Sequence, residues 1–141
     1  MQRDFFIGLE QLKHGSAIDL GEVIAHLAFN EQGLIPVISQ DASSGEVLMF
    51  AWMNQAALLQ TLATQRMTYW SRSRQQLWVK GESSGHCQQL IDMSFDCDGD
   101  VVLCRIQQQG PACHTGRPSC FYLDVEHDAQ QVIVKGEYQV S

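Results

Sequence analysis

The chain has 141 residues, of which 45% are hydrophobic, and this composition fits one compact domain with a core of its own. Sixteen acidic residues against nine Lys and Arg give a net charge of −7, which argues against a nucleic-acid binder or an anionic-membrane binder. No apolar run approaches the ~20 residues of a membrane helix, and the N-terminal stretch has no signal-peptide core, so we expect a cytoplasmic protein. Five cysteines in such a chain indicate metal binding or catalysis rather than disulfides.

The first 29 residues are predicted to form an N-terminal extension with one short helix. Residues 1–18 show no clear hydrophobic period. Asp19 is suited to cap a helix that runs to about Phe29, since its carboxylate can accept hydrogen bonds from the first backbone amides. Residues 30–33 are predicted to end this helix, with Gly33 available as its C-terminal stop.

A β-hairpin and a second helix are predicted next. The apolar runs 34–39 and 46–52 are separated by turn-forming residues, which is typical of a hairpin with a longer loop. Asn54 is suited to cap a helix over residues 55–65. Its apolar residues predict a buried side made of Leu58, Leu59 and Leu62.

The rest of the chain is predicted to form short strands separated by polar loops. Because strands outnumber helices, we expect an α+β fold of mostly antiparallel β-ribbons with about two helices. We divide the chain into the extension 1–29, a domain 30–126 and a C-terminal tail 127–141. The strands are expected at residues 67–71, 77–79, 88–95, 101–108, 120–125 and 132–134.

The first candidate metal site is the acidic segment Asp96-Cys97-Asp98-Gly99-Asp100. Three carboxylates so close together repel one another unless a cation lies among them, and their oxygens suit Mg²⁺ or Ca²⁺, whereas the thiolate suits zinc. The spacing does not fit an EF-hand, because Val101 and Gln107 stand where that loop needs Gly and Glu. A solvated acidic turn between two strands remains the alternative.

The second candidate metal site is a loop that carries Cys113 and Cys120. Together with Cys97 they would give three thiolates and one open position, which is a catalytic zinc pattern. A structural zinc site would need a fourth protein ligand, for which Cys87, Cys104 and His114 are candidates. The alternative is that cysteines pack as small apolar side chains, as we expect for Cys104 in the core and for Cys87 at the start of a strand.

The segment 69–86 holds most of the positive charge in the middle of the chain. Arg72, Arg74 and Lys80 lie beside hydroxyls and glycine-loop amides, a combination that suits phosphate groups, and Trp70 and Trp78 can stack on a base. The alternative is a solvated basic turn with core aromatics. His86 is a further candidate substrate contact, and His114 is suited to move protons at neutral pH because it adjoins a proposed metal ligand.

Read together, these stretches resemble the phosphoribosyl-AMP cyclohydrolase family over about residues 30–122. Several unusual motifs occur in the order that the family has them. They are GLIPVISQD (33–41), EVLMFAWMN (46–54), YWSRSR (69–74), LWVKGESSGH (77–86), DCDGD (96–100) and GPACHTGRPSCFY (110–122).

The resemblance implies an enzyme of histidine biosynthesis, at its third step, that works as an intertwined homodimer. Family members hydrolyse the N1–C6 bond of the adenine ring in phosphoribosyl-AMP and open it to a formimino imidazole carboxamide. The family's zinc ligands fall on Cys97 of one subunit and on Cys113 and Cys120 of its partner. Magnesium is assigned to Asp96, Asp98 and Asp100.

A mechanism follows as a hypothesis from this resemblance. Zinc lowers the pKa of bound water from ~15.7 toward ~7, and the resulting hydroxide attacks C6 while His114 shuttles the proton. The chemistry and motif positions suggest which residues bind the substrate and its phosphates. They are Arg72, Ser73, Arg74, Trp78, Lys80, Ser83, Ser84, Gly85, His86 and Arg117.

The main rival is a structural zinc-binding module without catalysis, which predicts four protein ligands and no ring-opening activity. A zinc nucleoside deaminase is disfavoured because the chain lacks the H-x-E and P-C-x-x-C pattern of that class. A thiol redox protein is disfavoured because no C-x-x-C is present.

Overall fold

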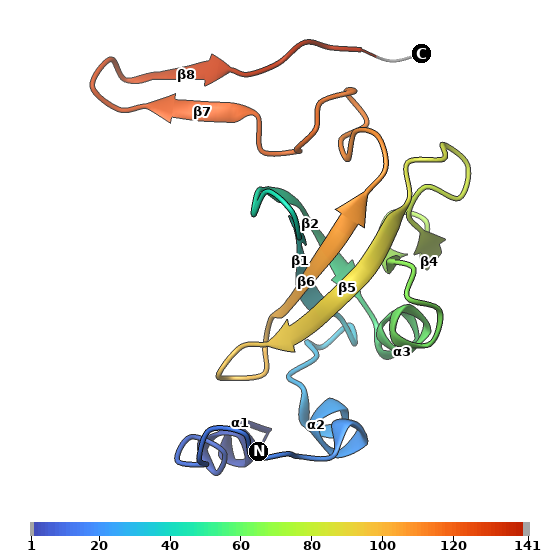
Figure 1. Cartoon of the computed structure of the whole chain (residues 1–141), viewed down its shortest axis with the longest axis vertical. Coiled ribbons are helices and arrows are strands. Elements are labelled where there is room, and N and C mark those ends of the chain that lie inside the picture. Colours follow the sequence, from blue (N-terminus) through green and yellow to red (C-terminus); the bar gives the residue numbers. More distant parts are fainter. Residues whose placement is uncertain (1, 140–141) are drawn as a thin grey trace.

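The computed structural model describes residues 2–139 and shows an α+β fold built around one four-stranded sheet (Figure 1). The strand order is β2-β1-β6-β5, and two further two-stranded ribbons pair β3 with β4 and β7 with β8. The elements are α1 (Gln2–Ile7), α2 (Leu20–His26), β1 (Ile35–Asp41), β2 (Val47–Met53), α3 (Gln55–Thr64), β3 (Thr68–Ser71), β4 (Gln76–Val79), β5 (Gln88–Phe95), β6 (Val102–Gln108), β7 (Leu123–Glu126) and β8 (Gln131–Val134).

The main sheet joins two antiparallel hairpins through one parallel contact. The β1–β2 and β5–β6 hairpins are antiparallel, whereas β1 and β6 run parallel, with Val37 opposite Val102. The prediction of a mostly antiparallel α+β fold is therefore confirmed. The hairpin expected from the runs 34–39 and 46–52 is also confirmed.

Both predicted helix caps are confirmed. The Asp19 carboxylate accepts a hydrogen bond from the amide of Glu22, and the Asn54 side chain accepts one from the amide of Ala57. The first of these helices ends at His26, earlier than predicted, because Leu27 already has an extended backbone conformation. The second ends at Thr64, where Gln65 takes the left-handed conformation.

Two predictions about the helices were wrong. A third helix, α1, forms within residues 1–18, and its Phe6 is buried in the core. A helix of six residues is too short to produce a recognisable period. Leu59 is exposed, because the buried face of α3 carries Ala57, Leu58 and Thr61, and Leu59 lies about 100° around the helix from Leu58.

The strand predicted over residues 120–125 begins only at Leu123. Residues 120–122 do not pair with β8, because the Cys120 amide donates its hydrogen bond to the carbonyl of Leu48 in β2. The predicted division at residues 126 and 127 falls in the turn of the β7–β8 hairpin, and the division into three segments stays a prediction.

The core lies between the main sheet, α3 and β3, and Leu58, Met67, Tyr69 and Ile106 are completely buried there. The β7–β8 hairpin differs, since every residue of both strands is exposed and the hairpin extends away from the sheet (Figure 1). Within residues 2–139, no helix is long and apolar enough to cross a membrane.

Candidate active site

Two of the three proposed zinc ligands meet in the loop that follows β6. The thiols of Cys113 and Cys120 lie within hydrogen-bonding reach of each other. The loop is held closed by hydrogen bonds from the Cys113 amide to the Arg117 carbonyl, at 3.2 Å, and from the Ser119 hydroxyl to the Val47 carbonyl, at 2.8 Å. Cys113 is buried and Cys120 is exposed, so the pair opens toward solvent on one side.

The surroundings of this pair shift the pKa values of the two thiols in opposite directions. Burial tends to raise the pKa of Cys113, but hydrogen bonds from Thr115 and Cys120 and the charge of Arg117 lower it overall. Although Cys120 as a whole residue is exposed, desolvation of its thiol raises its pKa to about 11, with the neighbouring Cys113 adding to the effect. Of the two thiols, Cys113 is therefore the one that loses its proton more readily.

Cys97, the third proposed ligand, lies at the other end of β6. Ligand atoms of Asp96, Cys97 and Asp98 lie within 4.8 Å of one another, in the turn between β5 and β6. The seven residues of β6 separate this turn from the loop of Cys113, a span of roughly 20 Å. Figure 1 shows the two loops at opposite ends of the β5–β6 ribbon. One chain therefore does not bring the three cysteines together.

Hydrogen bonds within the acidic turn hold its carboxylates close together. Asp96 accepts hydrogen bonds from the amides of Asp100 and Val101, at 2.8 and 3.1 Å. The carboxyl groups of Asp96 and Asp100 also share a hydrogen bond, which raises the pKa of Asp100, and the charges of Asp96 and Asp98 raise it further. The backbone carbonyl of Gly99 accepts a hydrogen bond from Ala28, which ties the turn to the segment after α2.

The loop between β6 and β7, residues 109–122, is called the Cys113 loop below. A cavity of about 360 Å³ opens beside it. Its lining includes Lys80, Ser84, His86, Cys113 and His114, all of which the sequence singled out. The Lys80 ammonium donates to the Ala112 carbonyl at 2.8 Å, and burial lowers its pKa although the nearby thiols oppose the change. The structure thus places a lysine, two imidazoles and the thiol of Cys113 around one space.

A second cavity, of about 440 Å³, adjoins the first. Lys80 and Ser84 line both of them. The second cavity adds three more of the predicted substrate contacts, which are Arg74, Trp78 and Ser83. Residues from β4 and from the 81–85 loop therefore converge with the Cys113 loop, although the two segments lie about thirty positions apart in the sequence.

Three other predicted substrate contacts have different surroundings. Arg117 is buried, donates to the Lys135 carbonyl at 2.8 Å and lies 4.0 Å from the centre of the Tyr122 ring, so it ties the Cys113 loop to the C-terminal segment. Ser73 lies 3.4 Å from Ser71 in the β3–β4 turn. Gly85 has a positive φ and closes the 81–85 loop through a hydrogen bond to the Gly81 carbonyl.

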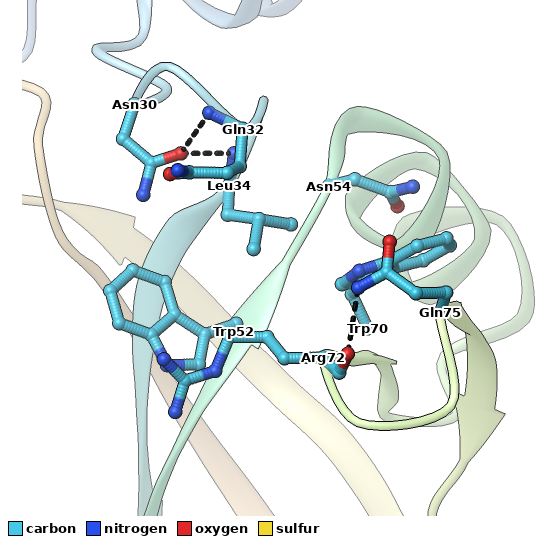
Figure 2. A pocket seen from close by; sticks show the side chains of 8 residues that line it. All are labelled: Asn30, Gln32, Leu34, Trp52, Asn54, Trp70, Arg72 and Gln75. Atoms are coloured by element: carbon cyan, nitrogen blue, oxygen red, sulfur yellow. Dashed lines mark hydrogen bonds between the residues drawn. The ribbon is translucent and has the colours of Figure 1, made fainter.

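Arg72 lines a different cavity, of about 410 Å³, on the other side of the β3–β4 turn (Figure 2). This cavity also contains Trp52 and Asn54, which the sequence analysis did not propose as functional. The available signal was positional, since Trp52 alternates with the buried Met53 and must face the other side of β2. A half-buried tryptophan on an open face is a candidate ligand contact.

The sequence analysis also missed a buried polar network behind the site. Ser39 donates to the hydroxyl of Tyr69, which donates to Gln88, both at 2.5 Å. Gln88 then donates to Gln108 at 2.8 Å, and Gln108 donates to the carbonyl of His86 at 3.2 Å. This network connects the sheet to a residue of the cavity lining, and its members lie too far apart in the sequence to form a motif.

Comparisons with known proteins agree on one family. A family model described as phosphoribosyl-AMP cyclohydrolase matches residues 49–122. The phosphoribosyl-AMP cyclohydrolase of Alkalilimnicola ehrlichii is 54% identical over 132 residues, 94% of this chain and 93% of the relative, so the similarity extends beyond residues 30–122 into the terminal segments. That of Dinoroseobacter shibae is 58% identical over 75% of this chain and 89% of its own, and phosphoribosyl-AMP cyclohydrolase 2 of Pseudomonas fluorescens is 55% identical over 90% and 86%.

Proposed function

Because this chain belongs to the phosphoribosyl-AMP cyclohydrolase family, we propose that it hydrolyses the N1–C6 bond of the adenine ring of 1-(5-phosphoribosyl)-AMP, in the cytoplasm. The ring opens to the formimino imidazole carboxamide ribotide, the third step of histidine biosynthesis. The observation that carries the proposal is the placement of the cysteines. Cys113 lines a cavity together with a lysine and two imidazoles, and its thiol lies within hydrogen-bonding reach of the Cys120 thiol, which is a suitable setting for zinc-assisted hydrolysis.

We infer that one zinc ion is held by Cys113 and Cys120 of one subunit and by Cys97 of the other. Zinc prefers thiolate ligands, and three of them leave one position open for water. When bound there, the metal supplies an activated water by lowering its pKa. The lowered pKa of Cys113 and its contact with Cys120 support this assignment, and the distance along β6 explains why the third thiolate must come from another chain.

A homodimer is the simplest assembly that brings the acidic turn of one subunit to the Cys113 loop of another. In a twofold dimer, each subunit offers both half-sites, so that two complete sites form at once. The exposed apolar surface of the C-terminal hairpin supports such an assembly, because monomeric proteins rarely expose apolar patches of this kind. Its large exposed side chains are Leu123, Val125, Val132, Ile133 and Val134.

We assign magnesium to the carboxylates of Asp96, Asp98 and Asp100. Their oxygens are suitable ligands, since Mg²⁺ prefers carboxylates and usually keeps several waters. The pKa of Asp100 is raised first by its hydrogen bond with Asp96 and further by the charges of Asp96 and Asp98, and a bound dication relieves repulsion of this kind.

We assign proton transfer and substrate binding to side chains of the two adjoining cavities. His114 is exposed beside Cys113, where an imidazole is able to carry a proton to N1 as the ring opens. Arg74, Lys80, Ser83 and Ser84 supply donors for a phosphate, and Trp78 offers an aromatic face. Ser73, Gly85, His86 and Arg117 also belong to the proposed substrate-binding set, with Arg117 acting through the fold of the Cys113 loop. Arg72 belongs to the set as well, but it lines a separate cavity.

The test combines turnover with metal content. Cys113→Ala and Cys120→Ala are expected to lose zinc and ring-opening activity together, each measured on purified protein with phosphoribosyl-AMP followed by absorbance. Cys87→Ala is the matched control, because Cys87 is half-buried but lies outside the proposed ligand set. Zinc retained with full turnover in Cys113→Ala would contradict the proposal. Loss of zinc in the Cys87 variant, with no activity in the parent protein, would favour a structural four-ligand site.

A further inference from the structure

The cavity that contains Arg72 is separate from the two that surround the Cys113 loop. It has a volume of about 410 Å³, which lies in the range of small-molecule sites. Figure 2 shows its side chains arranged around one space, with Trp52 on one side and Asn54, Trp70 and Gln75 on the other. Its lining residues are Asn30, Gln32, Leu34, Trp52, Asn54, Trp70, Arg72 and Gln75.

The register of the sheet places this cavity at the end where the acidic turn lies. Trp52 pairs with Pro36 of β1, and the next residue of β1, Val37, pairs with Val102 at the start of β6. The backbone of Trp52 is therefore two strands away from the acidic turn, or about 10 Å at the usual strand spacing. The Asn30 side of the cavity is close as well, since Ala28 donates a hydrogen bond to Gly99.

The charge of the cavity favours an anion. Its lining holds one arginine and no carboxylate, in a protein whose net charge is −7. Arg72 lies 5.0 Å from the centre of the Trp52 ring and, among the described residues, has no acidic partner. Arg105 is different, because its guanidinium is paired with Asp92. The Arg72 guanidinium thus keeps its N–H donors available for a planar, two-point contact with a phosphate.

Hydrogen bonds hold the side-chain amides around Arg72 in place and leave some of their donors and acceptors available to a ligand. The Asn30 oxygen accepts from the amides of Gln32 and Leu34, and the Asn54 oxygen caps α3. Gln75 donates to the carbonyl of Arg72 at 2.7 Å (Figure 2). Within residues 2–139, the side-chain nitrogens of the two asparagines and the side-chain oxygen of Gln75 have no hydrogen-bond partner. Such groups suit the hydroxyls of a sugar.

We propose that this cavity binds one phosphoribosyl group of the substrate, with Arg72 on the phosphate, the amides on the ribose hydroxyls and the two indoles as apolar walls. The inference rests on the proposed function, because it takes phosphoribosyl-AMP as the ligand. The substrate then reaches from the metal-binding turn into a pocket of the same subunit, while the Cys113 loop of the other subunit completes the zinc site.

The three tryptophans of the chain, Trp52, Trp70 and Trp78, allow a direct binding test with ribose 5-phosphate. Their indole N–H signals in an NMR spectrum are assigned by replacing each with Phe. Ribose 5-phosphate is expected to shift the signals of Trp52 and Trp70, and Arg72→Gln is expected to weaken that response at least about tenfold. Any shift of Trp78, in the other cavity, should persist in this variant. Arg66→Gln removes an equal charge at a separate cavity, which shares no residue with that of Arg72, and is the control.

Kinetics then show whether the ligand is the substrate. In Arg72→Gln, the KM for phosphoribosyl-AMP should rise about tenfold to a hundredfold, while zinc content and kcat stay near those of the parent protein. The inference is overturned if Trp52 and Trp70 do not respond, if Arg72→Gln responds like the parent, or if ribose 5-phosphate binds but KM is unchanged. Absence of turnover in the parent protein would overturn the proposed function instead, and the titration would still report on the cavity.

Discussion

The two ends of the β5–β6 hairpin carry similar chemistry but are built in different ways. The acidic turn, residues 96–100, is local, since hydrogen bonds within Asp96–Val101 organise it almost by themselves. The Cys113 loop is assembled from distant parts of the chain, since it contacts Leu48 of β2, Lys80 after β4 and Gln139 near the C-terminus. A short motif can therefore specify the first end, whereas only a folded chain can specify the second.

This difference also divides the proposed chemistry. The local end holds carboxylates and one thiol, and the assembled end holds two thiols, a half-buried lysine and two imidazoles. Each end lacks what the other has, and β6 keeps them apart in one subunit. The zinc site proposed above would need a second copy of the chain, so the proposal predicts that catalysis depends on assembly.

Subunit mixing gives the largest expected effect. Cys97→Ala and Cys113→Ala should each be inactive, since each removes one half of every zinc site. Mixed after mild unfolding and refolding, they should regain about a quarter of the parent activity, because half the dimers are mixed and each mixed dimer has one intact site. Turnover of the mixture measures this.

The control for mixing uses Cys113→Ala with Cys120→Ala. Both changes lie in the same half-site, so no mixed dimer contains an intact site, and the mixture should stay inactive. Equal recovery in both mixtures, or recovery in neither, would contradict a site shared between the two ends.

Removing a core side chain beside the acidic turn should give the next largest effect. Phe6 is buried and its ring packs so closely on Gly99 that a Cβ there would overlap it. Phe6→Ala is expected to lower the free energy of unfolding by about 3 kcal/mol, measured by urea denaturation. Ile7→Ala, at an exposed neighbouring position, should cost far less. Equal losses in the two variants would show that α1 does not support this end.

The buried network behind the Cys113 loop offers a smaller test. Tyr69→Phe leaves the Ser39 hydroxyl and the side-chain oxygen of Gln88 without their partner, so the free energy of unfolding should fall by about 2 kcal/mol. Tyr138→Phe is the control, because Tyr138 is 69% exposed. Identical denaturation midpoints for Tyr69→Phe and the parent protein would mean that the network does not stabilise the fold.

The smallest expected effect concerns the ion pair between Asp92 and Arg105, which lies between the two ends of the β5–β6 hairpin. The hydrogen bond from Arg105 lowers the pKa of Asp92, so the folded state holds the ionised carboxylate more strongly than the unfolded chain does. The resulting stability is present above the ordinary Asp pKa of about 4 and is lost as pH falls through the lowered folded value. The stability difference between the parent and Asp92→Asn should therefore be visible at pH 7 and disappear in acid.

Because both side chains of this pair are half-exposed, salt should weaken the difference as well. Thermal unfolding across pH 2–7, in low and high salt, measures both dependences. A difference that grew toward acid would contradict the assigned direction of the pKa shift.

Local signals predicted most of the elements correctly. Asp19 and Asn54 cap their helices because one side chain close to a backbone amide decides a helix start. The β1–β2 hairpin followed from two apolar runs separated by turn-forming residues. Leu59 was misplaced because only the position of α3 against β2 and β3 decides which of its apolar residues is buried.

By itself, the sequence determined which chemistry is available: the DCDGD turn, the two cysteines of the later loop, and a basic aromatic segment, in an order that identifies the family. The tertiary structure decided which of these groups meet. It joined Cys113 to Lys80 and His86, held Cys97 at the far end of β6, turned Arg117 toward the C-terminal segment and placed Arg72 in a cavity with Trp52. The physical reason is that motifs depend on neighbours along the chain, whereas sites depend on sheet register and loop packing, which are fixed by contacts between distant residues.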